Sequence, residues 1–236
     1  MLLGGIDFDF LKNNKRVSVL DYGCENGQYS IFLLKNGYKV VGIDINPESE
    51  KKVRSKLTIK ENKRFSFYCL NAEKDVLSLG EKFDCVLCRE TLEHVKNYEK
   101  LIREFYFMLK IDGYLLISVP TFFTEKYFRF WDSLWLKKCG HVNVFKKNQL
   151  LKLARKYRFY PAKIDKHSFR RTLFWSMVTP FKIDHDMGKI LNYKKLAKIA
   201  LFISDCFCYF RFVEKIGNKV LPKSYVFYLK KKSDEI

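Results

Sequence analysis

A turn of small residues between an apolar strand and a helix is the part of this chain best suited to hold a ligand. It reads Asp21-Tyr-Gly23-Cys24-Glu-Asn-Gly27. Its glycines let backbone N–H groups approach a ligand closely, and the N-terminus of the following helix favours negative charge. Asp44 ends the next predicted strand, where a carboxylate can accept hydrogen bonds from both hydroxyls of a ribose. Together these features predict a nucleotide-like ligand.

Residues that could move a proton lie outside this turn. Glu93 and His94 follow the fourth predicted strand, and His141 stands in a Gly-His-Val sequence farther along. A histidine titrates near neutral pH and is the natural general base for a hydroxyl, and a desolvated Glu90 or Glu93 could serve as well. Each has a structural alternative, because Glu93 and His94 can brace a helix and His141 can hold its turn by hydrogen bonds.

A sheet must bring these residues together. Short apolar runs predict seven strands, at 17–20, 39–43, 65–70, 83–88, 114–119, 163–167 and 224–229. Helical patterns lie between them, at 29–36, 47–57, 98–109 and 147–157. Continuous apolar strands alternating with helices are typical of a parallel sheet covered on both faces, with its ligand at the carboxyl ends of the strands. The expected fold is α/β, a Rossmann-like, doubly wound, mostly parallel seven-stranded sheet.

Several of these stretches together resemble the class I S-adenosylmethionine-dependent methyltransferases, in particular the small-molecule branch that includes the ubiquinone-biosynthesis O-methyltransferases. The resemblance rests on VLDYGCENGQYS (19–30), VVGIDINPE (40–48), FDCVLCRETLEHV (83–95), LKIDGYLLISVPT (109–121) and GHVNVFKKNQLLKLARKYRF (140–159). It implies an enzyme that uses S-adenosyl-L-methionine to methylate a small-molecule, lipid or glycan acceptor, with oxygen as the expected methylated atom.

The resemblance also implies roles for individual residues. Asp21 would orient the methionine moiety, with Gly23 and Gly27 packed against it. Asp44 would bind the ribose. The full predicted cofactor site is Asp21, Gly23, Cys24, Gly27, Asp44, Ile45, Asn71, Ala72 and Arg89. The predicted catalytic residues are His141, His94 and Glu93, and no metal ion is expected.

Two positions depart from the family pattern. Glu25 stands where the family usually has a third glycine, so its side chain must point away from the ligand or the loop must shift. Asn71 replaces an acid on the adenine side, although its amide oxygen can still accept a hydrogen bond from the adenine amino group. These departures keep open a second hypothesis, a non-catalytic protein that retains the fold and binds a partner.

Two segments interrupt the alternation of strands and helices. Residues 121–145 include a predicted helix, 123–135, whose aromatic stripe indicates either a core-facing helix or a lid over the pocket. Residues 168–221 form a predicted helical insertion, in which the apolar stretch 199–213 is bordered by Lys and Arg. We therefore divide the chain into a cofactor-binding core, 1–167 plus 222–232, and this insertion. The insertion is expected to contact the acceptor, an anionic membrane or a second subunit, and to set acceptor choice rather than cofactor binding.

The composition and the charge of the chain limit its possible partners. Of the 236 residues 47% are hydrophobic, which excludes a disordered chain, and the net charge is +19. Residues 151–236 hold 20 of the 45 basic residues but only 7 of the 26 acidic ones, which would attract an acidic partner such as nucleic acid, an anionic membrane or a phosphorylated acceptor. The alternative is that a Lys-rich composition reflects the genome or a high working temperature and not binding. An RNA methyltransferase stays open as a third hypothesis, although the chain lacks the Asn/Asp-Pro-Pro-aromatic and Pro-Cys signatures of base-modifying enzymes.

The seven cysteines show no disulfide or zinc spacing, and a lone Cys85-x-x-Cys88 lies in an apolar run. The first residues include Asp7 and Asp9 and lack the basic start of a signal peptide. We therefore expect free thiols and a cytoplasmic protein, with peripheral attachment to a membrane left open.

Overall fold

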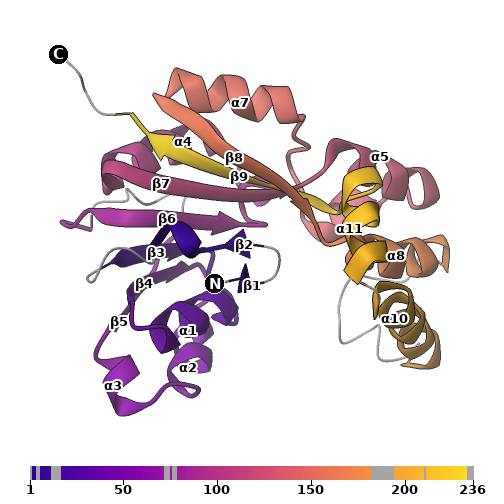
Figure 1. Ribbon diagram of the computed structural model, residues 1–236, viewed down its shortest axis with the longest axis horizontal. Helices are drawn as coiled ribbons and strands as arrows, with labels where there is room; N and C mark the ends of the chain where they lie inside the picture. Colours follow the sequence, from indigo (N-terminus) through magenta and orange to yellow (C-terminus); the bar gives the residue numbers. More distant parts are fainter. Residues whose placement is uncertain are drawn as a thin grey trace.

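A computed structural model describes residues 2–3, 6–11, 17–71, 75, 79–181, 194–209 and 211–232. Seven strands form one sheet: β3 (Ser18–Tyr22), β4 (Lys39–Asp44), β5 (Phe65–Cys69), β6 (Phe83–Arg89), β7 (Leu109–Pro120), β8 (Phe159–His167) and β9 (Ser224–Lys231). Their order is β5-β4-β3-β6-β7-β9-β8, and only the pairs made by β9 are antiparallel (Figure 1). This confirms the predicted mostly parallel seven-stranded sheet.

The strand order reverses at β3, which fixes where a ligand can sit. From β3 the chain first builds outward through β4 and β5, and it then returns to place β6 on the other side of β3. The helices that follow β3 and β6 consequently leave the sheet in opposite directions. The crevice between them, at the carboxyl ends of the strands, is the general ligand site of open α/β sheets.

Helices cover both faces of the sheet because alternate strand residues point to opposite sides. Val19 packs into one core and Leu20 into the other. The first core is covered by α1 (Gln28–Lys35), α2 (Glu48–Arg54) and the N-terminal elements, and the second by α4 (Tyr98–Met108) and α7 (Lys147–Lys156) (Figure 1). The shorter elements are β1 (Leu2–Leu3), β2 (Ile6–Asp7), η1 (Asp9–Leu11), α3 (Ile59–Asn62) and η2 (Leu92–His94).

The aromatic helix predicted at 123–135 is in fact two helices, α5 (Phe122–Trp131) and α6 (Trp135–Cys139). Asp132 separates them, because its backbone is extended (φ −136°) and its carboxylate accepts a hydrogen bond from the N–H of Leu134. A charged residue of α5 is buried, since Glu125 is only 2% exposed. The aromatic stripe is exposed instead, at Phe123, Tyr127, Phe130, Trp131 and Leu134.

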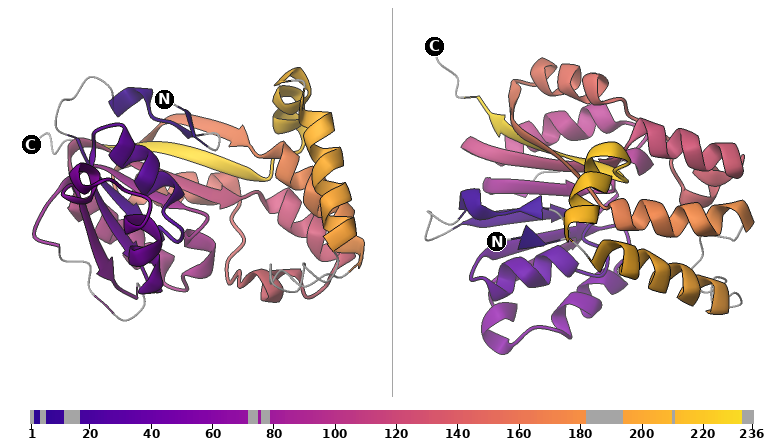
Figure 2. Two further views of the ribbon diagram at one scale, coloured as in Figure 1. Left: turned by 90° about the horizontal axis from the view of Figure 1, so that it is seen from below. Right: turned by 45° about the vertical axis from the view of Figure 1, so that its right-hand side comes forward.

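The predicted helical insertion is confirmed over its described residues. It contains α8 (Phe169–Val178), η3 (Thr179–Phe181), α10 (Lys194–Tyr209) and α11 (Arg211–Val220). Figure 2 shows these helices gathered beyond one end of the sheet, where β8 leads into them and β9 leaves them. Among the described residues, none of the helices combines the length and apolar character needed to cross a bilayer.

Candidate active site

A pocket of about 660 Å³ lies at the carboxyl ends of β3, β4 and β6. Seven of the predicted cofactor residues line it: Asp21, Gly23, Cys24, Asp44, Ile45, Asn71 and Arg89. Gly27 does not line the pocket, and Ala72 lies outside the described residues. The fold thus gathers residues from the ends of four strands around one cavity, as a cofactor site requires.

The two glycines of the first turn have different neighbours. Gly23 has φ +74°, and a Cβ there would lie 2.4 Å from Thr91 Oγ1, so only glycine fits between the loop and the segment after β6. Gly27 has φ +71° and faces away from the pocket, with Val53 of α2 at 2.1 Å from the place of a Cβ. Close packing of α1 on α2 therefore occupies that side of Gly27, and its predicted contact with the methionine moiety has no support from the lining of the pocket.

One end of the pocket is built around Asp44. One carboxylate oxygen accepts a hydrogen bond from the N–H of Asn46 at 2.9 Å and the other from the N–H of Glu25 at 2.7 Å. Glu25 has φ +49°, so it adopts the left-handed conformation normally given to glycine, and its side chain is exposed. Ile45, 66% exposed, and Asn71 lie next to this carboxylate and offer an apolar surface and an amide to a flat ring.

Asp21 marks the other end of the pocket and is 3% exposed. Its carboxylate accepts a hydrogen bond from Ser30 Oγ at 2.6 Å. Burial nevertheless raises its pKa to about 6, since the hydrogen bond offsets only part of the desolvation. A cationic group of a ligand placed beside Asp21 would favour its ionised form.

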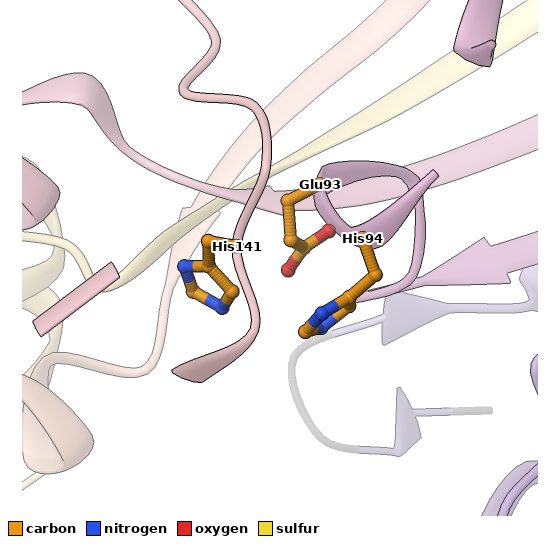
Figure 3. Close-up of side chains that lie close together, drawn as sticks. All are labelled: Glu93, His94 and His141. Carbon is orange, nitrogen blue, oxygen red and sulfur yellow. The ribbon is translucent and has the colours of Figure 1, made fainter. Parts of the chain in front are cut away.

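Glu93, His94 and His141 lie together beside the pocket (Figure 3), with one possible ligand atom of each within 4.8 Å of the others. His94 Nδ1 is 3.0 Å from the carbonyl oxygen of Gly140, and His141 Nδ1 is 2.9 Å from Glu125 Oε2. Because both partners only accept, each Nδ1 carries a proton and donates it to its partner. Of the three, only His94 lines the pocket.

Burial sets the protonation of this cluster. Glu93 is 2% exposed, and its Oε2 has no hydrogen-bond partner among the residues that the structure describes. Burial and the neighbouring Glu90 raise the pKa of Glu93 well above its usual value, whereas burial lowers the pKa of His94. Two imidazole nitrogens and a carboxyl group can pass a proton from one to another, and the same donor set suits a divalent cation such as Zn²⁺ or Mn²⁺.

Glu125 is the buried partner that orients His141. It accepts hydrogen bonds from His141, from Trp135 Nε1 at 3.0 Å and from Lys223 Nζ at 3.3 Å. Burial opposes its charge, but the His141 hydrogen bond and Lys223 outweigh burial and keep the pKa of Glu125 below its usual value. Sequence reasoning missed this role because one glutamate in an amphipathic helix resembles a solvent-facing residue.

Other pocket residues were missed, among them Tyr29, Thr91 and Arg171, whereas Glu90, a candidate base from the sequence, does line the pocket. Glu90 accepts a 2.6 Å hydrogen bond from Ser118 Oγ. Burial would raise its pKa, but Lys223, Ser118 and the guanidinium groups of Arg89 and Arg171 hold it below the usual value. Arg171 belongs to α8, so the insertion contributes a side chain to this pocket. No sequence pattern around Arg171 marks it as a pocket residue.

Comparison with known proteins agrees with this geometry. Residues 4–163 match the family described as "Methyltransferase domain". The chain belongs to this methyltransferase family. A ubiquinone biosynthesis O-methyltransferase from Pelagibacter ubique is 34% identical to this methyltransferase over 105 residues, which make up 44% of this chain and 42% of the relative. The chain thus matches less than half the length of that relative.

Solved structures of low sequence identity show the same fold as this methyltransferase. Geranyl diphosphate C-methyltransferase from Streptomyces coelicolor, solved with Mg²⁺, geranyl diphosphate and S-adenosyl-L-homocysteine, aligns with a TM-score of 0.61 and 12% identity, over 93% of this chain and 74% of that one. A [4+2]-cyclase aligns with a TM-score of 0.57 and 16% identity, over 93% and 76% of the two chains. The second structure shows that fold alone does not determine the reaction.

Proposed function

We propose that this methyltransferase binds S-adenosyl-L-methionine and transfers its methyl group to an oxygen of a small-molecule, lipid or glycan acceptor. The observation that carries the proposal is that Asp44, the buried Asp21 and His94 line one pocket. The Asp44 carboxylate is suited to accept hydrogen bonds from ribose hydroxyls. In this pocket Asp44 binds the ribose, Ile45 and Asn71 contact the adenine, and Asp21 faces the ammonium of the methionine moiety.

The reaction itself asks little of the side chains beyond alignment. The acceptor oxygen forms a bond to the methyl carbon as the bond from that carbon to the sulfonium sulfur breaks. Holding the two reactants in line can contribute several kcal/mol, about 7–11 kcal/mol in well-oriented systems. The acceptor hydroxyl must lose its proton, and we assign that proton to His94 Nε2, because His94 lines the pocket and its Nδ1 is already engaged by Gly140.

Glu93 and His141 then act as positioning residues for His94. The ring centroids of His94 and His141 are 4.9 Å apart, and Glu125 holds His141 from behind. Burial and His141 lower the pKa of His94, whereas the carboxylates of Glu90 and Glu125 act in the opposite direction and would partly stabilise the charge that forms as the acceptor is deprotonated.

The test is a methyl-transfer assay with labelled S-adenosyl-L-methionine against lipid, glycan, small-molecule and RNA fractions. We expect label in one of the first three, and a large fall in kcat for His94→Gln with cofactor affinity unchanged. An active His94→Gln variant would remove His94 as the base. Loss of activity with a chelator, restored by Mn²⁺, would instead assign the Glu93, His94 and His141 cluster to a divalent cation.

The two other hypotheses are separated by binding measurements. A non-catalytic protein that retains the fold is supported by the left-handed Glu25 and by the same fold in a [4+2]-cyclase. Calorimetry with S-adenosyl-L-methionine tests it, because no binding would leave only the non-catalytic function. RNA binding that falls steeply with salt, together with label in the RNA fraction, would favour an RNA methyltransferase.

Exposed apolar side chains support an amphiphilic acceptor and contact with an anionic membrane. On α10 and α11 they are Ile199, Leu201, Phe202, Ile203, Tyr209, Phe212, Ile216 and Val220. The aromatic stripe of α5 is exposed as well, and none of its residues lines the pocket. Lys198, Lys215 and Lys219 are exposed among the apolar residues and would pair with acidic lipids. We expect sedimentation with anionic vesicles that is lost at high salt, and no sedimentation at any salt would contradict membrane binding.

A cytoplasmic location remains part of the proposal. Six cysteines of the described residues are free thiols: Cys24, Cys69, Cys85, Cys88, Cys139 and Cys206. Burial raises the pKa of Cys24, Cys85 and Cys88, so these thiols are unreactive. Free thiols of this kind support a reducing compartment.

A further inference from the structure

Three hydrogen-bond donors at one end of the pocket lack an acceptor among the residues that the structure describes. Tyr29 is 4% exposed, and its hydroxyl group makes no hydrogen bond. Arg89 Nε is buried and also without a partner. Within the described part of the chain, the guanidinium of Arg171 makes neither a hydrogen bond nor an ion pair. All three residues line the pocket.

The three donors share one neighbourhood. The guanidinium of Arg89 lies over the ring of Tyr29, with its carbon 4.9 Å from the ring centroid. Arg89 and Arg171 both act electrostatically on the carboxylate of Glu90 and on the phenol of Tyr29. Tyr29 and Arg89 Nε are buried, and a buried donor without a partner costs about 1–3 kcal/mol, so a ligand that supplies acceptors here would be bound more tightly. Arg171 is exposed and adds a positive charge at the same place without this cost.

Arg171 is held in this place by the way α8 leaves the sheet. The helix begins at Phe169, directly after β8 and the left-handed Ser168 (φ +67°). The N–H of Phe169 donates a hydrogen bond to Asn218 Oδ1 at 2.8 Å. A Cβ on Gly217 would lie 2.1 Å from the ring of Phe169, so α11 packs directly on the first turn of α8. Arg171 therefore stands on a fixed helical turn.

We propose that Tyr29, Arg89 and Arg171 bind the α-carboxylate of the methionine moiety of S-adenosyl-L-methionine. This rests on the proposed function, and it assigns to the insertion a direct part in cofactor binding. Guanidinium groups pair with carboxylates through paired, charge-assisted hydrogen bonds. Asp21 and Glu90 line the same end of the pocket and offer carboxylates to the α-ammonium. The two sets of opposite charge match the two charges of an amino acid.

The test compares two ligands that differ only in the carboxylate, S-adenosyl-L-methionine and its decarboxylated form. Calorimetry on the whole chain should show that Arg171→Gln weakens binding of S-adenosyl-L-methionine at least about tenfold, since a charge-assisted hydrogen bond is lost. Binding of the decarboxylated ligand should change less than about twofold, because it has no group for Arg171 to contact.

The neighbouring Arg170 supplies a matched control. It pairs with Asp205 at 3.0 Å and does not line the pocket, so Arg170→Gln should leave the affinity for both ligands unchanged. Tyr29→Phe removes only a hydroxyl and keeps the ring beneath Arg89, and it should give a smaller loss with the same selectivity for the carboxylate. Thermal unfolding of each variant shows whether it is folded.

Two outcomes would overturn the inference. Equal losses for both ligands would show that Arg171 acts on the shape of the pocket, and no loss for either would show that it serves the acceptor or no ligand. If the unaltered protein binds neither ligand, the proposed function fails, and that result is distinct from a failure of Arg171 alone.

Discussion

The backbone N–H of Glu25 donates a hydrogen bond of 2.7 Å to the carboxylate of Asp44. This bond joins the turn after β3 to the end of β4, the neighbouring strand of the sheet. It fixes one oxygen of Asp44 and, through the turn, the position of the backbone that faces the pocket. The turn and the Asp44 carboxylate therefore form one unit, and changes to either residue should affect both.

Asp44→Ala should weaken binding of S-adenosyl-L-methionine by about 1–3 kcal/mol, because a charged acceptor of hydrogen bonds is lost. It also leaves the N–H of Glu25 without its partner. Asp44→Asn is the matched control, since its amide oxygen can still accept one of these bonds and should retain part of the affinity. Calorimetry measures both variants, and unchanged affinity of Asp44→Ala would remove this residue from the site.

Glu25→Gly should keep cofactor binding and should stabilise the protein by about 1 kcal/mol. The reason is that residue 25 has φ +49°, a conformation that costs an L-residue about 1–2 kcal/mol and costs glycine little. Urea unfolding and calorimetry on the same samples test both parts. If binding disappears, the Glu25 carboxylate is itself a ligand or an essential brace.

Cofactor affinity should rise with pH through about 6 and then level off. Asp21 has its pKa raised to about 6 in the ligand-free protein, so below that pH the carboxyl group is protonated and must lose its proton to face an ammonium. The limiting slope is about tenfold per pH unit. Calorimetry should be done between pH 5 and pH 7, because the amino group of the ligand titrates only at about 7.7–8.0 and stays protonated in this range. Asp21→Asn should bind weakly and without this slope, and a slope that persists in the variant would assign the proton to another group.

The same shift has the opposite effect on the ligand-free fold. Between the usual value of 3.8 and about 6, Asp21 binds a proton in the folded chain but not in the unfolded one. Its contribution to stability is therefore lost as the pH rises through this window, and it is constant above it. The free energy of unfolding of Asp21→Asn, minus that of the unaltered protein, should therefore be larger at pH 7 than at pH 4. An unfolding difference that does not vary with pH would contradict the raised pKa.

Glu125→Gln should destabilise the protein by about 3–5 kcal/mol, the usual result of breaking one side of a buried ion pair. The charge of Lys223, whose side chain is 6% exposed, would then lack its carboxylate. A double variant that also carries Lys223→Met should recover part of the loss, which urea unfolding can measure. Additive losses in the double variant would show that the two residues do not interact.

The sequence was sufficient for the sheet but only for part of the site. Strands such as Phe83–Arg89 are apolar over nearly their whole length, so each could be recognised locally, and the residues that end them meet at one edge by topology alone. His94 and His141 are brought together by the packing of two loops, which local patterns do not encode. The aromatic stripe of α5 could not be placed from the sequence, because apolar spacing does not show whether a helix face is covered. The buried face of α5 is instead the one that carries Glu125 and its hydrogen bonds. Arg171 gave no signal, since its position depends on where α8 leaves β8.

The buried carboxylate of Glu125 also limits how this protein can change over evolutionary time. It holds His141, Trp135 and Lys223, which come from three separate parts of the chain. A single substitution at position 125 leaves a buried cation and an unoriented imidazole at once, so the first step of any replacement is deleterious. A lineage could exchange this residue only through paired substitutions, with position 223 changing first or together with it. The part of the fold that fastens α5 and α6 to the core is therefore expected to diverge in correlated steps.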